Sequence, residues 1–106
     1  MSPTLAKVSD LVSRKLVRLS EHAESRILSN GIKYREVLAG LSSAVIVEDY
    51  PLYAHGPAIL ARQPDAKGNW IHVLWGLPAD GTELAFVVTV YRPDSRWDQD
   101  KLRRLM

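Results

Sequence analysis

The hydrophobic pattern of the first half of the chain is that of short amphipathic helices. Between residues 5 and 14, apolar positions recur at intervals of three and four, the spacing that lines one face of a helix. We expect Thr4 to cap the start of this helix. Residues 32–41 show a similar pattern before a serine pair interrupts it. Between these helices, residues 16–19 are expected to be extended.

The stretch between Ser20 and Gly31 carries a complete set of helix signals. Ser20 is a good N-cap, because its hydroxyl can accept a hydrogen bond from an amide of the first turn. Gly31 can adopt the left-handed conformation that ends a helix without a steric penalty. This helix places His22 and Arg26, four residues apart, on one exposed face. The residues of this helix that we expect to pack inward are Ala23, Ile27 and Leu28.

From residue 44 onward the pattern becomes that of β-strands. Runs rich in β-branched and aromatic residues alternate with turns that contain proline, glycine and aspartate. The predicted strands cover residues 44–50, 57–62, 70–77 and 83–91. Because the links are short, we predict an antiparallel meander. The predicted fold class is therefore α+β, with two or three N-terminal helices packed on a four-stranded antiparallel sheet.

The two sides of the last predicted strand differ in polarity. One side carries the larger apolar residues and is the expected core face: Leu84, Phe86, Val88 and Val90. The other side carries the hydroxyl groups of Thr89 and Tyr91. Which side His72 of the preceding strand shares depends on strand register, which alternation alone does not determine.

Composition limits the class of protein. The chain has 106 residues with 46% hydrophobic and 25% charged side chains, which suits one globular domain. We divide it into an N-terminal helix (1–15), a core (16–98) and a C-terminal tail or short helix (99–106). Without cysteines, a signal-peptide pattern or a long apolar run, it is expected to be cytoplasmic and not membrane-bound. A net charge of +2 is compatible with a polyanionic partner but does not indicate one.

Several short motifs follow one another along the chain: Ser20-Glu21-His22-Ala23-x-x-Arg26, Asn30-Gly31-Ile32, Tyr50-Pro51, Ile71-His72-Val73, Thr89-Val90-Tyr91-x-Pro93 and Trp97. Their order resembles that of a known family, the domain of unknown function 4258. The resemblance spans about residues 16–98, and the chain departs from the family pattern at Asn30, where arginine is more frequent.

The element order of this family, helices before an antiparallel sheet, is similar to that of small bacterial toxins of the RelE, ParE and BrnT type. This similarity implies a metal-independent ribonuclease whose partners are RNA and a cognate antitoxin protein. It is a likeness of fold, which by itself transfers no site. The alternative is a non-catalytic protein- or RNA-binding module that uses the sheet edge and Trp97.

Metal-free RNA cleavage needs a base for the 2′-hydroxyl, a cation for the phosphorane and an acid for the leaving 5′-oxygen. Histidine suits the acid and base roles, and arginine matches phosphate oxygens with its guanidinium fork. The candidate catalytic residues are therefore His22, Arg26, His72 and Tyr91. The candidate residues for binding RNA or a partner are Arg92, Arg96 and Trp97.

Each candidate also has a structural explanation. His72 in an apolar strand is equally consistent with a buried structural histidine, and Tyr91 with a core aromatic residue whose hydroxyl reaches the surface. His22 and Arg26 are also consistent with an ordinary solvated helix face. No cofactor or metal is expected, because no histidine lies at ligand spacing from the paired carboxylates.

Overall fold

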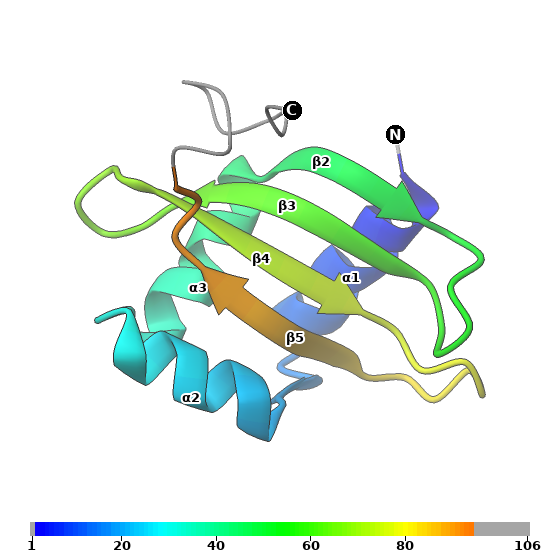
Figure 1. Cartoon of the computed structure of the whole chain (residues 1–106). Helices are drawn as coiled ribbons and strands as arrows, with labels where there is room; N and C mark the ends of the chain where they lie inside the picture. Colours follow the sequence, from blue (N-terminus) through cyan, green and yellow to red (C-terminus); the bar gives the residue numbers. More distant parts are fainter. Residues whose placement is uncertain (1, 95–106) are drawn as a thin grey trace.

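The computed structural model describes residues 2–94, which fold into three α-helices and a five-stranded sheet (Figure 1). The helices are α1 (Pro3–Ser13), α2 (Glu21–Ser29) and α3 (Tyr34–Gly40), and a 3-10 turn, η1 (Leu41–Ser43), follows α3. The strands are β1 (Val17–Leu19), β2 (Val45–Tyr50), β3 (Ala58–Pro64), β4 (Trp70–Gly76) and β5 (Ala85–Tyr91). Their order across the sheet is β1-β5-β4-β3-β2.

The α+β class is confirmed, but the prediction of four purely antiparallel strands is wrong. Strands β2 to β5 form the predicted antiparallel meander. The segment expected to be merely extended forms a fifth strand, β1, which pairs in parallel with β5 and sets Val17 opposite Ala85. A three-residue strand has no periodicity to recognise. Its pairing follows a turn at Lys15, whose φ of 63° turns the chain after α1.

The ends of α1 and α2 are set by local hydrogen bonds. α1 begins earlier than predicted, because Ser2 rather than Thr4 caps it: the Ser2 hydroxyl accepts from the Leu5 N–H at 3.2 Å. Both signals for α2 are confirmed. The Ser20 hydroxyl accepts a 2.9 Å hydrogen bond from a first-turn N–H, and Gly31 has a φ of 66°.

The core lies between the sheet and the helix layer formed by α1 and α3 (Figure 1). The buried sheet residues on this side are Ile59, Ala61, Gln63, Ile71, Val73, Trp75, Ala85, Val87 and Val90. The predicted core face of β5 is confirmed for Val90 but wrong for Phe86 and Val88, which lie on the opposite, open face. A β-bulge at Val88 shifts the alternation, so Val90 is buried while Thr89 and Tyr91 lie on the open face.

α2 runs alongside β5 (Figure 1). It buries Ala23 and Ile27, as predicted, but Leu28 is 74% exposed and does not pack inward. No helix among residues 2–94 has the length and apolar character needed to cross a bilayer. The tail or short helix predicted for residues 99–106 lies outside the described residues.

Candidate functional site

The open face of the sheet carries a row of polar side chains across three strands. Strand register places His72 of β4 between Tyr91 of β5 and Arg62 of β3. The Arg62 guanidinium carbon lies 3.9 Å from the ring centroid of Trp70, which is a cation–π contact. Polar groups from neighbouring strands therefore meet on the face that the helices leave uncovered.

α2 adds His22 to this row, because its first turn is fastened to β5. The Ser20 N–H donates to the Val87 carbonyl at 3.1 Å, and the Ser20 hydroxyl donates to the Val88 carbonyl at 2.9 Å. These bonds fix the start of the helix beside the bulge. As a result, the His22 Nε2 lies 3.0 Å from the Thr89 Oγ1.

His72 and Tyr91 form a second pair directly beside the first. The His72 Nδ1 lies 3.1 Å from the Tyr91 hydroxyl, and the two rings meet edge to face with centroids 5.2 Å apart. His72 has no exposed surface, whereas Tyr91 is partly exposed. A molecule on this face would therefore contact Tyr91 rather than His72.

Arg26 follows His22 by one turn on the same side of α2. The helix continues along the strand direction, since the Arg92 Nε just beyond β5 donates to the Asn30 carbonyl at the end of α2, at 3.3 Å. Arg26 therefore lies between the His22 contact and the end of β5. Its exposed guanidinium makes no hydrogen bond or ion pair with any residue from 2 to 94.

Arg92, a predicted binding residue, holds parts of the fold together. Its guanidinium also forms a 2.9 Å ion pair with Asp65, whose side chain is only 3% exposed. Burial alone would raise the pKa of the Asp65 carboxyl, but the hydrogen bonds from Arg92 and from the Asn69 and Lys67 N–H groups outweigh it and hold the pKa below its ordinary value. The other two predicted binding residues, Arg96 and Trp97, lie outside the described residues.

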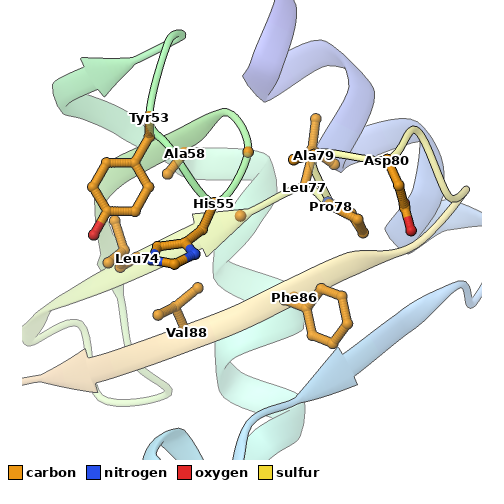
Figure 2. Close-up of a pocket in the computed structure, with 12 residues that line it drawn as sticks. Tyr53, His55, Ala58, Leu74, Leu77, Pro78, Ala79, Asp80, Phe86 and Val88 are labelled. Atoms are coloured by element: carbon orange, nitrogen blue, oxygen red, sulfur yellow. The ribbon is translucent and has the colours of Figure 1, made fainter.

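Sequence reasoning missed the apolar part of the open face. Two adjoining hollows of about 600 and 340 Å³ lie there, and both are lined by Tyr53, Ala58 and Leu74. The smaller hollow reaches Thr89 and Tyr91, so it adjoins the polar row. The missed signal was the closely spaced aromatic side chains in the loop after β2, which the structure folds over the sheet (Figure 2).

The described part of the chain holds no cluster of three or more side chains suited to bind a metal ion. The open face and α2 do bring together two histidines, a tyrosine hydroxyl and an exposed guanidinium. Such groups can move protons and neutralise an anion.

The fold and this face define a small α+β protein with one open sheet face that bears histidine, tyrosine and arginine. The chain belongs to the family described as "Domain of unknown function (DUF4258)", whose sequence profile matches residues 19–92. This match confirms the family resemblance drawn from the motifs, and it covers α2 and the strands that form the polar row. No curated protein and no solved structure matches the chain.

Proposed function

We propose that this protein is a metal-independent endoribonuclease whose active site is the polar row on the open sheet face. One observation carries the proposal. The His22–Thr89 contact at 3.0 Å and the His72–Tyr91 contact at 3.1 Å stand on successive open-face positions of β5. Thr89 and Tyr91 are two residues apart on β5, so the Cα atoms that carry these two contacts are about 7 Å apart along the strand. One phosphodiester can lie across both contacts.

The chemistry requires no metal. A base takes the proton of the 2′-hydroxyl, O2′ attacks the adjacent phosphorus, and the bond from phosphorus to O5′ breaks as an acid protonates O5′. The products are a 2′,3′-cyclic phosphate and a 5′-hydroxyl. No other reactant is consumed, because the proton removed from one oxygen is balanced by the proton given to the other.

The residues take distinct roles in this proposal. With its Nε2–H donating to Thr89, His22 presents the lone pair of Nδ1 as the base. Arg26, on the same side of α2, binds the phosphorane oxygens. Tyr91 donates its hydroxyl proton to O5′. Buried His72 orients that hydroxyl and is therefore a positioning residue rather than a group that touches RNA.

The biological setting that we propose is a toxin–antitoxin pair in the cytoplasm. The support is the order of α2 and α3 before the antiparallel strands β2 to β5, which resembles that of the RelE and BrnT types, although β1 adds a parallel strand to the sheet. In this setting the partner is a cognate antitoxin protein that restrains the ribonuclease.

The test is cleavage of a mixed-sequence RNA in a chelator, with circular dichroism to check folding. We expect His22→Ala to lower kcat/KM by about 10²–10⁴-fold, the usual contribution of a general base. Arg26→Lys is expected to lower it about tenfold or more, because lysine keeps the charge but loses the fork. Arg18→Ala is the control, since Arg18 lies on β1 outside the row. Purified wild-type protein without RNase activity and without a growth phenotype on overexpression would contradict the proposal.

The positioning role of His72 is tested with a double-mutant cycle. If His72 acts only through the Tyr91 hydroxyl, His72→Gln lowers kcat/KM in the wild type but adds little in the Tyr91→Phe background. Equal losses in both backgrounds would contradict that role.

A second candidate function, a non-catalytic binding module, is favoured by the apolar hollows beside the row. Binding of RNA or a protein on this face without any cleavage would support it.

A further inference from the structure

The larger hollow on the open face has a specific chemical character. It measures about 600 Å³, which is room for a nucleoside, and its middle is formed by apolar side chains of β4 and β5, among them Leu74 and Val88. Figure 2 shows the rings of Tyr53 and His55 toward one side of the pocket, and Phe86 and Asp80 toward the other.

The aromatic side of the pocket is built by the loop between β2 and β3. The Tyr53 and His55 rings have centroids 5.7 Å apart and an interplanar angle of 56°. The ring centroids of Tyr53 and Tyr50 are 6.4 Å apart, and Tyr53 is 56% exposed. Flat, exposed rings above an apolar floor are the usual surface on which an unpaired base stacks.

The opposite end of the pocket offers a hydrogen-bond acceptor. The Asp80 Oδ1 accepts from the Thr82 N–H at 2.9 Å and from the Thr82 hydroxyl at 2.6 Å. The Asp80 residue is exposed and lines this end of the pocket. The hydroxyl of Thr82, and then its N–H, lower the pKa of the Asp80 carboxyl, so this group is a carboxylate at neutral pH. A carboxylate oxygen accepts from the exocyclic amino group of a base.

The pocket is continuous with the polar row. Tyr53, Ala58 and Leu74 line both this pocket and the smaller hollow, which in turn is lined by Thr89 and Tyr91. A strand of RNA whose phosphate lies on the row therefore has its neighbouring base within reach of the pocket.

We propose that this pocket binds one base of single-stranded RNA next to the cleaved bond, and that Asp80 selects bases with an exocyclic amino group over uracil. The proposal rests on the proposed ribonuclease function for its substrate. An apolar side chain of a protein partner would fit the floor but would make no hydrogen bond with the Asp80 carboxylate. A nucleobase can stack on the aromatic rings, contact the apolar floor and donate a hydrogen bond to the carboxylate.

Binding and cleavage are measured separately, so that the two proposals can fail independently. The probes are short 2′-O-methyl RNA oligonucleotides, whose blocked 2′-oxygen prevents cleavage, and binding is followed by fluorescence anisotropy. Tyr53→Ala is expected to weaken binding about tenfold, the scale of one lost base–aromatic stack. The matched control is Leu52→Ala in the same loop, because Leu52 is 95% exposed and does not line the pocket.

Base selection is tested with Asp80→Asn. The asparagine carbonyl can still accept from Thr82, so the turn is preserved, but the second oxygen becomes an amide donor. We expect oligonucleotides with cytosine, adenine or guanine at one position to bind the wild type several-fold better than those with uracil. In Asp80→Asn this preference is expected to shrink or reverse, since uracil presents an acceptor to the new donor.

Each outcome decides one of the proposals. Cleavage by the wild type with no effect of Tyr53→Ala on binding or on base preference would overturn the pocket proposal and leave the ribonuclease. Binding that depends on Tyr53 without cleavage would overturn the ribonuclease and keep the base pocket. The base pocket would also be overturned if the wild type bound no RNA and instead bound a purified antitoxin protein, and if Tyr53→Ala abolished that binding of the antitoxin.

Discussion

At the scale of single residues, Gln63 shows how a polar side chain is accommodated in the core. It has no exposed surface. Its Oε1 accepts from the Trp75 Nε1–H at 2.7 Å, and its Nε2 donates to the Val37 carbonyl at 2.8 Å. The side chain thus satisfies one buried group of the sheet and one of α3, so it links the two layers beneath the open face.

Replacing Gln63 by leucine tests this link. The change leaves the Trp75 N–H and the Val37 carbonyl without partners, and each buried unsatisfied group costs about 1–3 kcal/mol. We expect Gln63→Leu to lower the free energy of unfolding by at least about 2 kcal/mol, measured by urea denaturation. Leu28→Ala, at a 74% exposed position, is the control and is expected to change it by less than about 0.5 kcal/mol. A Gln63→Leu variant as stable as the wild type would show that the link contributes nothing.

At the scale of elements, α2 is the part that completes the candidate site. The Ser20 hydroxyl bonds the start of α2 to β5, and Arg92 donates to the carbonyl of Asn30, the residue that follows α2. Gly31 then reverses the chain toward α3 with a φ of 66°, and the space around its missing side chain is empty within 4 Å. Any cost of a larger residue at position 31 is therefore conformational and does not come from a clash.

This gives a prediction for Gly31. Gly31→Val is expected to destabilise the protein by more than about 1 kcal/mol, because β-branched residues are poorly tolerated in the left-handed region. Gly31→Asn is expected to cost less, since asparagine enters that region more readily. Thermal unfolding measures both, and an unchanged melting temperature for the valine variant would remove the helix-ending role of Gly31.

At the scale of the whole molecule, the turn between β3 and β4 joins separate layers through carboxylates. Glu36 of α3 accepts from the Lys33 N–H at 2.6 Å and from the Ala66 N–H at 2.8 Å, and these two bonds lower the pKa of Glu36. Asp65 in the same turn pairs with Arg92, and its pKa is also lowered. Helix, turn and the end of the sheet are thus held together by ionised groups.

The pH dependence of stability follows from these lowered pKa values. A carboxyl whose pKa is lower in the folded than in the unfolded state stabilises the fold above its unfolded pKa, about 4 for Asp and Glu. That stabilisation is lost as the pH falls through the folded pKa. We therefore expect the free energy of unfolding to fall as the pH is lowered from 5 to about 2.5. Asp65→Asn should be less stable at pH 7 and show a shallower fall. A wild-type curve that is flat over this range would contradict the prediction.

The candidate site was predictable as a set of residues but not as a geometry. His22 and Arg26 could be named because residues four apart in a helix lie on the same side of it. His72 and Tyr91 could be named from the family resemblance, but their contact depends on the register of β4 against β5. The structural role of Arg92, which was predicted to be a binding residue, could not be predicted because both of its partners lie far away in sequence. They are Asp65 and the Asn30 carbonyl.

The sequence by itself determined the features whose signals are local: the Ser20 cap, the Gly31 ending and the approximate positions of the strands of the meander. The cap and the ending depend on bonds and dihedral angles within a few residues, so a short window contains their causes. Only the tertiary structure decided the pairing of β1 with β5, the bulge at Val88 and the contact between His22 and Thr89, which are 67 residues apart. Such features arise from packing between distant segments, where many registers satisfy the same local pattern and burial of the whole core selects one.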